Sequence, residues 1–154
     1  NGGEKLVKIK VNNCFHDISY YLVQYFLSEG FEVYGYDELD QAQKEFYYSM
    51  VGRNALFHFS DVTDNHVDEI DVTYTFNDDS TCLITSQKGK DNNVKIDYSQ
   101  VSFKERASKV QQENTENQIE MIQFVKWLVQ LNEYTLVPKN IVVFSQNREG
   151  IYII

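Results

Sequence analysis

Proline, cysteine and long apolar runs are scarce in this sequence of 154 residues. One proline and seven glycines exclude a collagen-like or linker-like chain. The two cysteines form no CxxC motif, which favours free thiols in a reducing cytosol. No apolar run reaches the roughly 20 residues that span a bilayer, and no signal-peptide segment precedes the first predicted strand. We therefore expect a cytoplasmic protein without a membrane partner.

Basic residues are also scarce, since 14 lysines and arginines stand against 23 acidic residues, giving a net charge of −9. Between residues 29 and 79, 13 acids accompany only Lys44 and Arg53. Such a segment repels phosphates, so we expect no nucleic-acid partner. Eleven tyrosines and ten phenylalanines argue against a disordered chain.

Signals for strands and helices alternate along the chain. Short apolar runs predict strands, and apolar residues that recur at i, i+3 and i+4 predict helices. The predicted strands are 5–11, 31–37, 55–59, 69–76, 81–85, 94–98 and 140–145. The predicted helices are 18–27 and 108–134, with 38–52 helical or mixed. The length and this pattern predict a single domain, 1–154.

This alternation predicts an α/β fold in three layers with a mostly parallel sheet. The first strand, helix and second strand form a βαβ unit, which implies a parallel pair. Right-handed crossovers then favour a Rossmann-like strand order, 3-2-1-4-5. The runs at 81–85 and 94–98 flank a KGKDNN turn and predict a β-hairpin around residues 80–100. This hairpin is either inserted into the sheet or lies over its edge.

Three stretches, in this order and spacing, resemble the NAD-dependent epimerase/dehydratase family, the extended short-chain dehydrogenase/reductases. The stretch from LVKIKV to FEVYGYD looks like the opening βαβ unit of that family. RNALFHFSDVTD (53–64) is similar to the stretch that meets the adenine. ENTENQIEMIQFVKWL to PKNIVVFSQNREGIY (113–152) looks like the helix and fifth strand that lead to the catalytic residues. The resemblance implies the N-terminal, dinucleotide-binding part of such an enzyme.

The three glycines of the family's phosphate loop are replaced in this chain. Their positions fall on Asn13, His16 and Ser19. Asn13 can still take a left-handed turn, His16 places a ring where the pyrophosphate would lie, and Ser19 crowds the helix against the sheet. The resemblance implies that Asp37 holds the adenosine ribose and that Asp61 meets the adenine. With the loop glycines replaced, an ordinary turn or N-cap aspartate is the favoured interpretation of both.

The catalytic set of the family is lost as well. Its Ser/Thr position falls on Asn147 or Arg148, and its Tyr-x-x-x-Lys helix would come after Ile154. We therefore expect no catalytic residue and no resident cofactor. The three histidines lack the compact spacing of a zinc site, so we expect no metal.

These losses predict a degenerate and truncated Rossmann-like pseudoenzyme. We interpret it as a non-catalytic protein-interaction or regulatory module of the bacterial cytosol, with a protein partner or as a homodimer. One alternative is an NAD(P) or nucleotide sensor that uses Asp37 and Asp61. Another is a residual nucleotide-sugar epimerase/dehydratase-type enzyme, or different chemistry built on Cys14, His16 and Asp17. Asp17 is the expected N-cap of the first helix.

Overall fold

Strands and helices alternate along the described part of the chain. The computed structural model describes residues 6–62, 69–86, 93–103, 118–131, 139–145 and 151–153. The strands are β1 (Lys8–Asn12), β2 (Glu32–Tyr36), β3 (Phe57–Ser60), β4 (Val72–Phe76), β5 (Thr81–Ser86), β6 (Asn93–Gln100), β7 (Ser102–Phe103), β8 (Gln118–Ile119), β9 (Asn140–Ser145) and β10 (Ile151–Ile153). The helices are α1 (Asp17–Ser28), α2 (Ala42–Val51) and α3 (Met121–Leu131).

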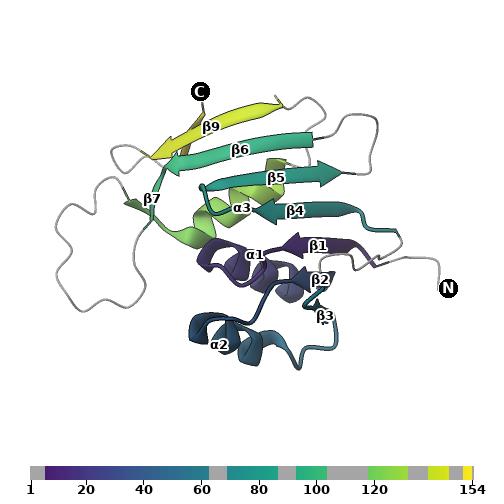
Figure 1. The fold of residues 1–154 in the computed structure, drawn as a ribbon. Helices are drawn as coiled ribbons and strands as arrows, with labels where there is room; N and C mark the ends of the chain where they lie inside the picture. The colour runs from purple at the N-terminus through teal and green to yellow at the C-terminus, as the bar shows by residue number, and fades with distance from the viewer. Residues whose placement is uncertain are drawn as a thin grey trace.

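Eight of the described strands form one sheet, in the order β10-β9-β6-β5-β4-β1-β2-β3. Figure 1 shows them stacked from β9 at the top to β3 at the bottom. Strands β3, β2, β1 and β4 are parallel neighbours, and β6 is parallel to β9. The fold is therefore α/β and Rossmann-like with a mostly parallel sheet, and the predicted order 3-2-1-4 is confirmed.

The predicted hairpin is an internal part of the sheet. β5 pairs in the antiparallel sense with both β4 and β6, and β6 pairs on its other side with β9. The insertion around residues 80–100 is thus confirmed, although the KGKDNN turn lies mostly outside the described residues. The strand expected directly beside β4, residues 140–145, stands beyond the hairpin. The edges of this sheet are β3 and β10.

The described helices share one face of the sheet, which differs from the predicted three layers. α1 packs beside α3, and α2 meets α1 where the rings of Tyr20 and Tyr47 stack with centroids 4.0 Å apart. A right-handed crossover from β6 to β9 would put α3 on the other face, because it advances along the sheet in the opposite direction to β1–α1–β2. Among the described residues, no helix covers that other face.

The two faces of the sheet have different chemistry. Buried residues alternate with half-exposed ones along β1, β2 and β4. The buried set is apolar, as at Val11 and Val33, whereas the opposite set contains Lys10, Thr73 and Thr75. Strict alternation is typical of a sheet with one hydrated face, because a sheet covered on both faces has near-continuous apolar strands.

The long helix predicted for residues 108–134 is described only in part. α3 occupies Met121–Leu131, and Gln118–Ile119 is a short strand paired with β7. The ranges 104–117 and 132–134 lie outside the described residues. α3 contributes Phe124 and Leu128, both fully buried, to the same core as α1. No described helix has the length and apolar character needed to cross a membrane.

Candidate functional site

The loop between β1 and α1, residues 13–16, lies where the parallel strands end, the edge at which α/β folds place their ligands. Asn13 has a left-handed backbone, with φ of 60°, as predicted. Its side-chain amide donates to the Phe76 carbonyl oxygen at the end of β4, at 2.6 Å. The Cys14 N–H donates to the Tyr36 carbonyl oxygen at 3.0 Å. The loop is therefore tied to the ends of both neighbouring strands.

Ser19 fixes the same loop from inside α1. Its hydroxyl donates to the Asn13 carbonyl oxygen at 2.7 Å and accepts the His16 N–H at 3.0 Å. The helix begins at Asp17 and its N-cap is His16, which corrects the expectation that Asp17 is the cap. A hydroxyl at the third helical position can bond back to the N–H of the N-cap, as in a capping box. Ser19 is fully buried and makes the hydrogen bonds of the turn.

Asp37 is buried beneath the loop, with 1% of its surface exposed. One carboxylate oxygen accepts the Phe15 N–H at 2.9 Å. The other accepts the Glu38 N–H at 2.7 Å and pairs with the Lys44 ammonium at 3.0 Å. Both oxygens are thus engaged by the chain itself, at the position where the resemblance implies a ribose ligand.

Lys44 is the site residue that sequence reasoning missed. Its ammonium also lies 3.3 Å from the carboxylate of Asp40, which precedes α2 by two residues. Burial lowers its pKa, but the hydrogen bonds and charges of Asp37 and Asp40 outweigh burial and raise the pKa above its usual value. Lys44 is therefore protonated at neutral pH. The sequence feature that could have indicated it is its position among acidic residues, because Lys44 is one of only two bases between residues 29 and 79.

A polar hollow of ≈ 400 Å³ opens beside the loop. Its lining includes Asn13, His16, Asp37, Lys44 and Asp78. A second hollow of ≈ 300 Å³ shares His16 and Asp78 with the first. Carboxylates outnumber the single lysine around the first hollow, so the local potential is negative and disfavours a phosphate.

Asp61 is the predicted site residue that stands apart. It is exposed just after β3 and does not line either hollow. Burial raises the pKa of Tyr36, and the carboxylates of Glu38, Asp37 and Asp61 raise it further. The structure therefore brings together the other four predicted residues, while Asp61 acts on the site only through its charge.

Cys14 is fully buried, so its thiol is not accessible from solvent. Its sulfur packs against the backbone of β2, where a Cβ added to Gly35 would lie 2.8 Å from Sγ. Burial raises the pKa of the thiol well above its usual value, and the charge of Asp37 raises it further. A protonated, buried thiol is a poor nucleophile. Among the described residues, no group of three or more His, Cys, Asp or Glu is placed to hold a metal ion.

The chain matches no family model and no curated protein sequence. Among solved structures, it is similar to a yeast methylglyoxal/isovaleraldehyde reductase complexed with NADPH. The likeness covers 35% of this chain and 17% of the reductase, at 22% identity and a TM-score of 0.30. The matched part of this chain thus spans about a sixth of the reductase's length.

Proposed function

We propose that this chain is a non-catalytic Rossmann-like protein that binds no dinucleotide and acts through contact with another protein. One observation carries the proposal: the backbone N–H groups of the loop already donate hydrogen bonds to acceptors within the chain. The Cys14 N–H donates to a carbonyl oxygen of β2, and the Phe15 N–H donates to the Asp37 carboxylate. The His16 N–H donates to the Ser19 hydroxyl. In a dinucleotide-binding loop such groups are free to face the phosphates.

The Asp37 carboxylate acts here as a resident anion. A pyrophosphate that approached the loop would have to displace this carboxylate from the Phe15 N–H and then lie beside the same negative charge. The displaced carboxylate oxygen, which is buried, would be left without its donor, and this costs about 1–3 kcal/mol. The negative potential of the hollow adds a further repulsive contribution. The loop is therefore closed to a dinucleotide by bonds that the fold itself requires.

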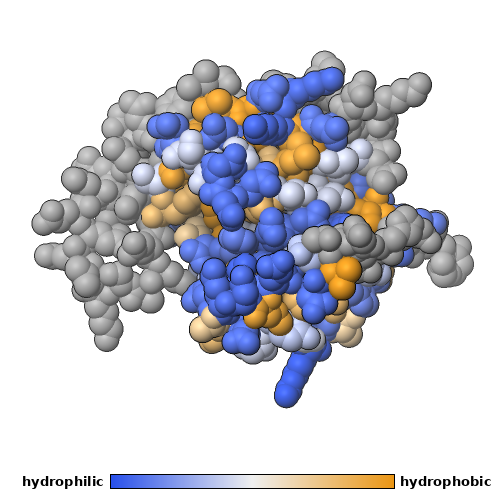
Figure 2. Space-filling model, in the orientation of Figure 1, coloured by the Kyte–Doolittle hydropathy of each residue, from blue (hydrophilic) through white to orange (hydrophobic). Residues whose placement is uncertain are grey.

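Exposed apolar residues on α2 support the protein-contact part of the proposal. Phe46 and Met50 lie one turn apart and are 57% and 59% exposed. Figure 2 shows apolar residues standing among hydrophilic ones at the bottom of the view, where α2 lies. Exposed apolar residues that cluster on one element favour contact with another molecule. The free, buried thiols of Cys14 and Cys82 favour a reducing cytosol.

Thermal unfolding in the presence of nucleotides tests this proposal. The ligands are NAD, NADH, NADP, NADPH, ATP and a nucleotide sugar, each at millimolar concentration. A ligand at about 100 times its dissociation constant adds about 2.7 kcal/mol to the unfolding free energy. In a domain of this size that raises Tm by about 5–11 °C. We expect no such rise with any of them, and a rise of several degrees with one dinucleotide would overturn the proposal.

A second candidate is an NAD(P) or nucleotide sensor, which the position of Lys44 favours. Its ammonium lines the ≈ 400 Å³ hollow and is the one lysine there that could meet a phosphate. If ATP or NADP raised Tm, Lys44→Ala should abolish the rise, whereas the matched change Lys10→Ala on the opposite face of the sheet should keep it. An equal rise in both variants would exclude Lys44 as the phosphate contact.

A further inference from the structure

The edge strand β3 has backbone groups that point away from the sheet. Among the described strands it pairs with β2 alone, with Val33 opposite Phe57. The Val33 N–H donates to the Leu56 carbonyl oxygen at 2.8 Å, so the even-numbered residues of this strand face β2. In a parallel ladder the residues between them face outward. The Phe59 N–H and C=O and the Phe57 C=O therefore lie on the open side.

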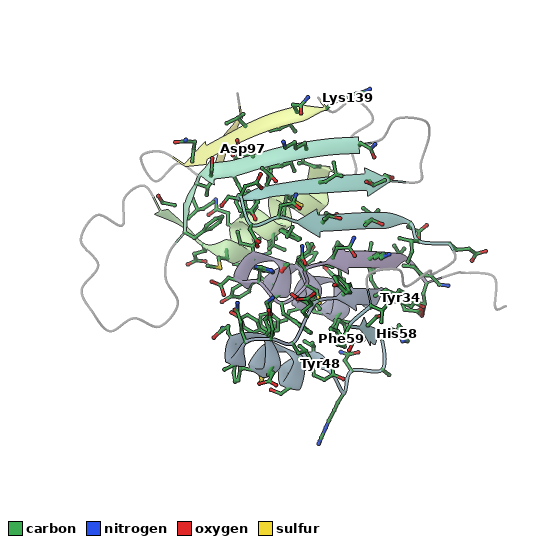
Figure 3. The ribbon with its side chains drawn as sticks, in the orientation of Figure 1. Tyr34, Tyr48, His58, Phe59, Asp97 and Lys139 are labelled. Carbon is green, nitrogen blue, oxygen red and sulfur yellow. The ribbon has the colours of Figure 1, made fainter. Side chains whose placement is uncertain are left out.

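An aromatic pair lies on each face of β3, as Figure 3 shows. On the helix side, Tyr48 of α2 contacts Phe59 with ring centroids 4.8 Å apart. On the hydrated side, Tyr34 stacks on His58 with centroids 4.6 Å apart. The Glu32 carboxylate accepts the Tyr34 hydroxyl and lies 3.8 Å from the His58 ring nitrogen. A strand added along β3 would meet one of these pairs with each alternate side chain.

The charges around this edge select the kind of strand that fits. Asp61 is exposed directly after β3, and the Glu32 carboxylate lies 3.8 Å from the His58 ring nitrogen. Arg53 is the one described arginine in this region. A second copy of the chain carries the same excess of carboxylates at this edge, so its charge is not complementary. A segment with lysine or arginine is complementary to them.

We propose that an extended segment of a partner protein, in which lysine or arginine alternates with apolar residues, adds to the sheet along β3. The main-chain bonds to Phe59 give the alignment, and side chains on alternate faces give selectivity. This inference rests on the proposed function, because it names the class of partner for a domain that acts through protein contact. It also assigns a role to a short edge strand that carries neither proline nor lysine, two of the residues that usually protect an open edge.

A labelled peptide tests the proposal against two matched variants. The probe is an acetylated, fluorescein-labelled octapeptide, VKVTVKVK, whose binding is followed by fluorescence anisotropy. Phe59→Pro removes the outward N–H, whereas Phe59→Val removes the same ring and keeps the N–H. We expect a micromolar dissociation constant for the natural chain and for Phe59→Val, and binding weaker by about tenfold or more for Phe59→Pro. The acidic peptide VEVTVEVE should bind more weakly by a similar factor.

Several results would overturn the proposal. These are no binding of the basic peptide at about 1 mM, equal binding by the two Phe59 variants, or equal binding of the acidic peptide. If Phe59→Pro does not fold, a peptide N-methylated along one edge replaces it, and undiminished binding of that peptide would count against β-strand addition. A dimer in light scattering that Phe59→Val retains and Phe59→Pro loses would assign the edge to a second copy instead.

Failure of this inference is distinguishable from failure of the proposed function. Dinucleotide binding in the thermal assay would overturn the proposed function and leave the peptide results unaffected. Conversely, if neither the peptide nor any nucleotide binds, β3 is not the docking edge. The proposal that the loop binds no dinucleotide would then be unaffected.

Discussion

Replacing Asp37 by alanine is the most informative perturbation of this fold. The change removes the acceptor of the Phe15 N–H, which is buried, and the main partner of the Lys44 ammonium. Breaking a buried, hydrogen-bonded ion pair by removing one partner costs about 3–5 kcal/mol. Because Lys44 keeps Asp40 at 3.3 Å, we expect the lower half of that range. The loss is a large share of the roughly 5–15 kcal/mol that stabilises a domain.

Urea unfolding followed by circular dichroism measures this loss, with two control variants. Asp37→Asn keeps one oxygen for the Phe15 N–H but turns an amide nitrogen toward the Glu38 N–H and the Lys44 ammonium, so its destabilisation should be smaller than that of Asp37→Ala but larger than that of a surface change. Asp61→Ala removes an exposed carboxylate at the end of the next strand and should change stability by no more than about 0.5 kcal/mol. A loss below about 1 kcal/mol for Asp37→Ala, or one equal to that of Asp61→Ala, would refute the reasoning.

Three further predictions concern the packing and the buried titratable groups. Gly35→Ala should lower the urea midpoint by an amount equivalent to about 1–3 kcal/mol, because the new Cβ would lie 2.8 Å from the Cys14 sulfur and 2.9 Å from the Phe57 ring. Burial raises the pKa of both Cys14 and Cys82, so a disulfide reagent such as DTNB should label neither thiol in the folded protein and both in urea; rapid labelling of the native chain would contradict the burial. Burial, together with the hydrogen bond to Asp17, raises the pKa of Tyr47 from 10.0 to about 12, so the stability that this phenol contributes is complete below pH 10 and is lost as the pH rises toward 12. Urea midpoints across that window should fall more steeply for the natural chain than for Tyr47→Phe, and parallel curves would contradict the assignment.

Local patterns in the sequence predicted the elements that position the site. The apolar stripe that predicts a helix over 18–27 corresponds to α1 at Asp17–Ser28, and the two runs of the hairpin correspond to β5 and β6. The βαβ spacing then places Asn13, His16 and Ser19 in one loop, since the loop must follow β1 and enter α1. Asparagine in the left-handed turn was predictable because few other residues adopt it at low cost.

Non-local pairings account for what the sequence did not reveal. The burial of Asp37 and its partner Lys44 depends on how α2 packs against the loop, and no periodic pattern encodes that contact. The shared face of the helices depends on the crossover from β6 to β9, which brings α3 beside α1. The alternation of apolar residues and lysine in KLVKIKV already indicated a hydrated face, but the alternation of strands and helices along the chain favoured three layers.

The central claim is that the loop N–H groups belong to the fold and are closed to a phosphate. An NMR titration of the ¹⁵N-labelled chain with NADPH tests it most directly, by following the amides of Cys14, Phe15 and His16. We predict that these amides keep their chemical shifts and their slow hydrogen exchange up to millimolar NADPH. A saturable shift of the Phe15 amide, with release of its bond to Asp37, would contradict the account and show that the loop still accepts a dinucleotide.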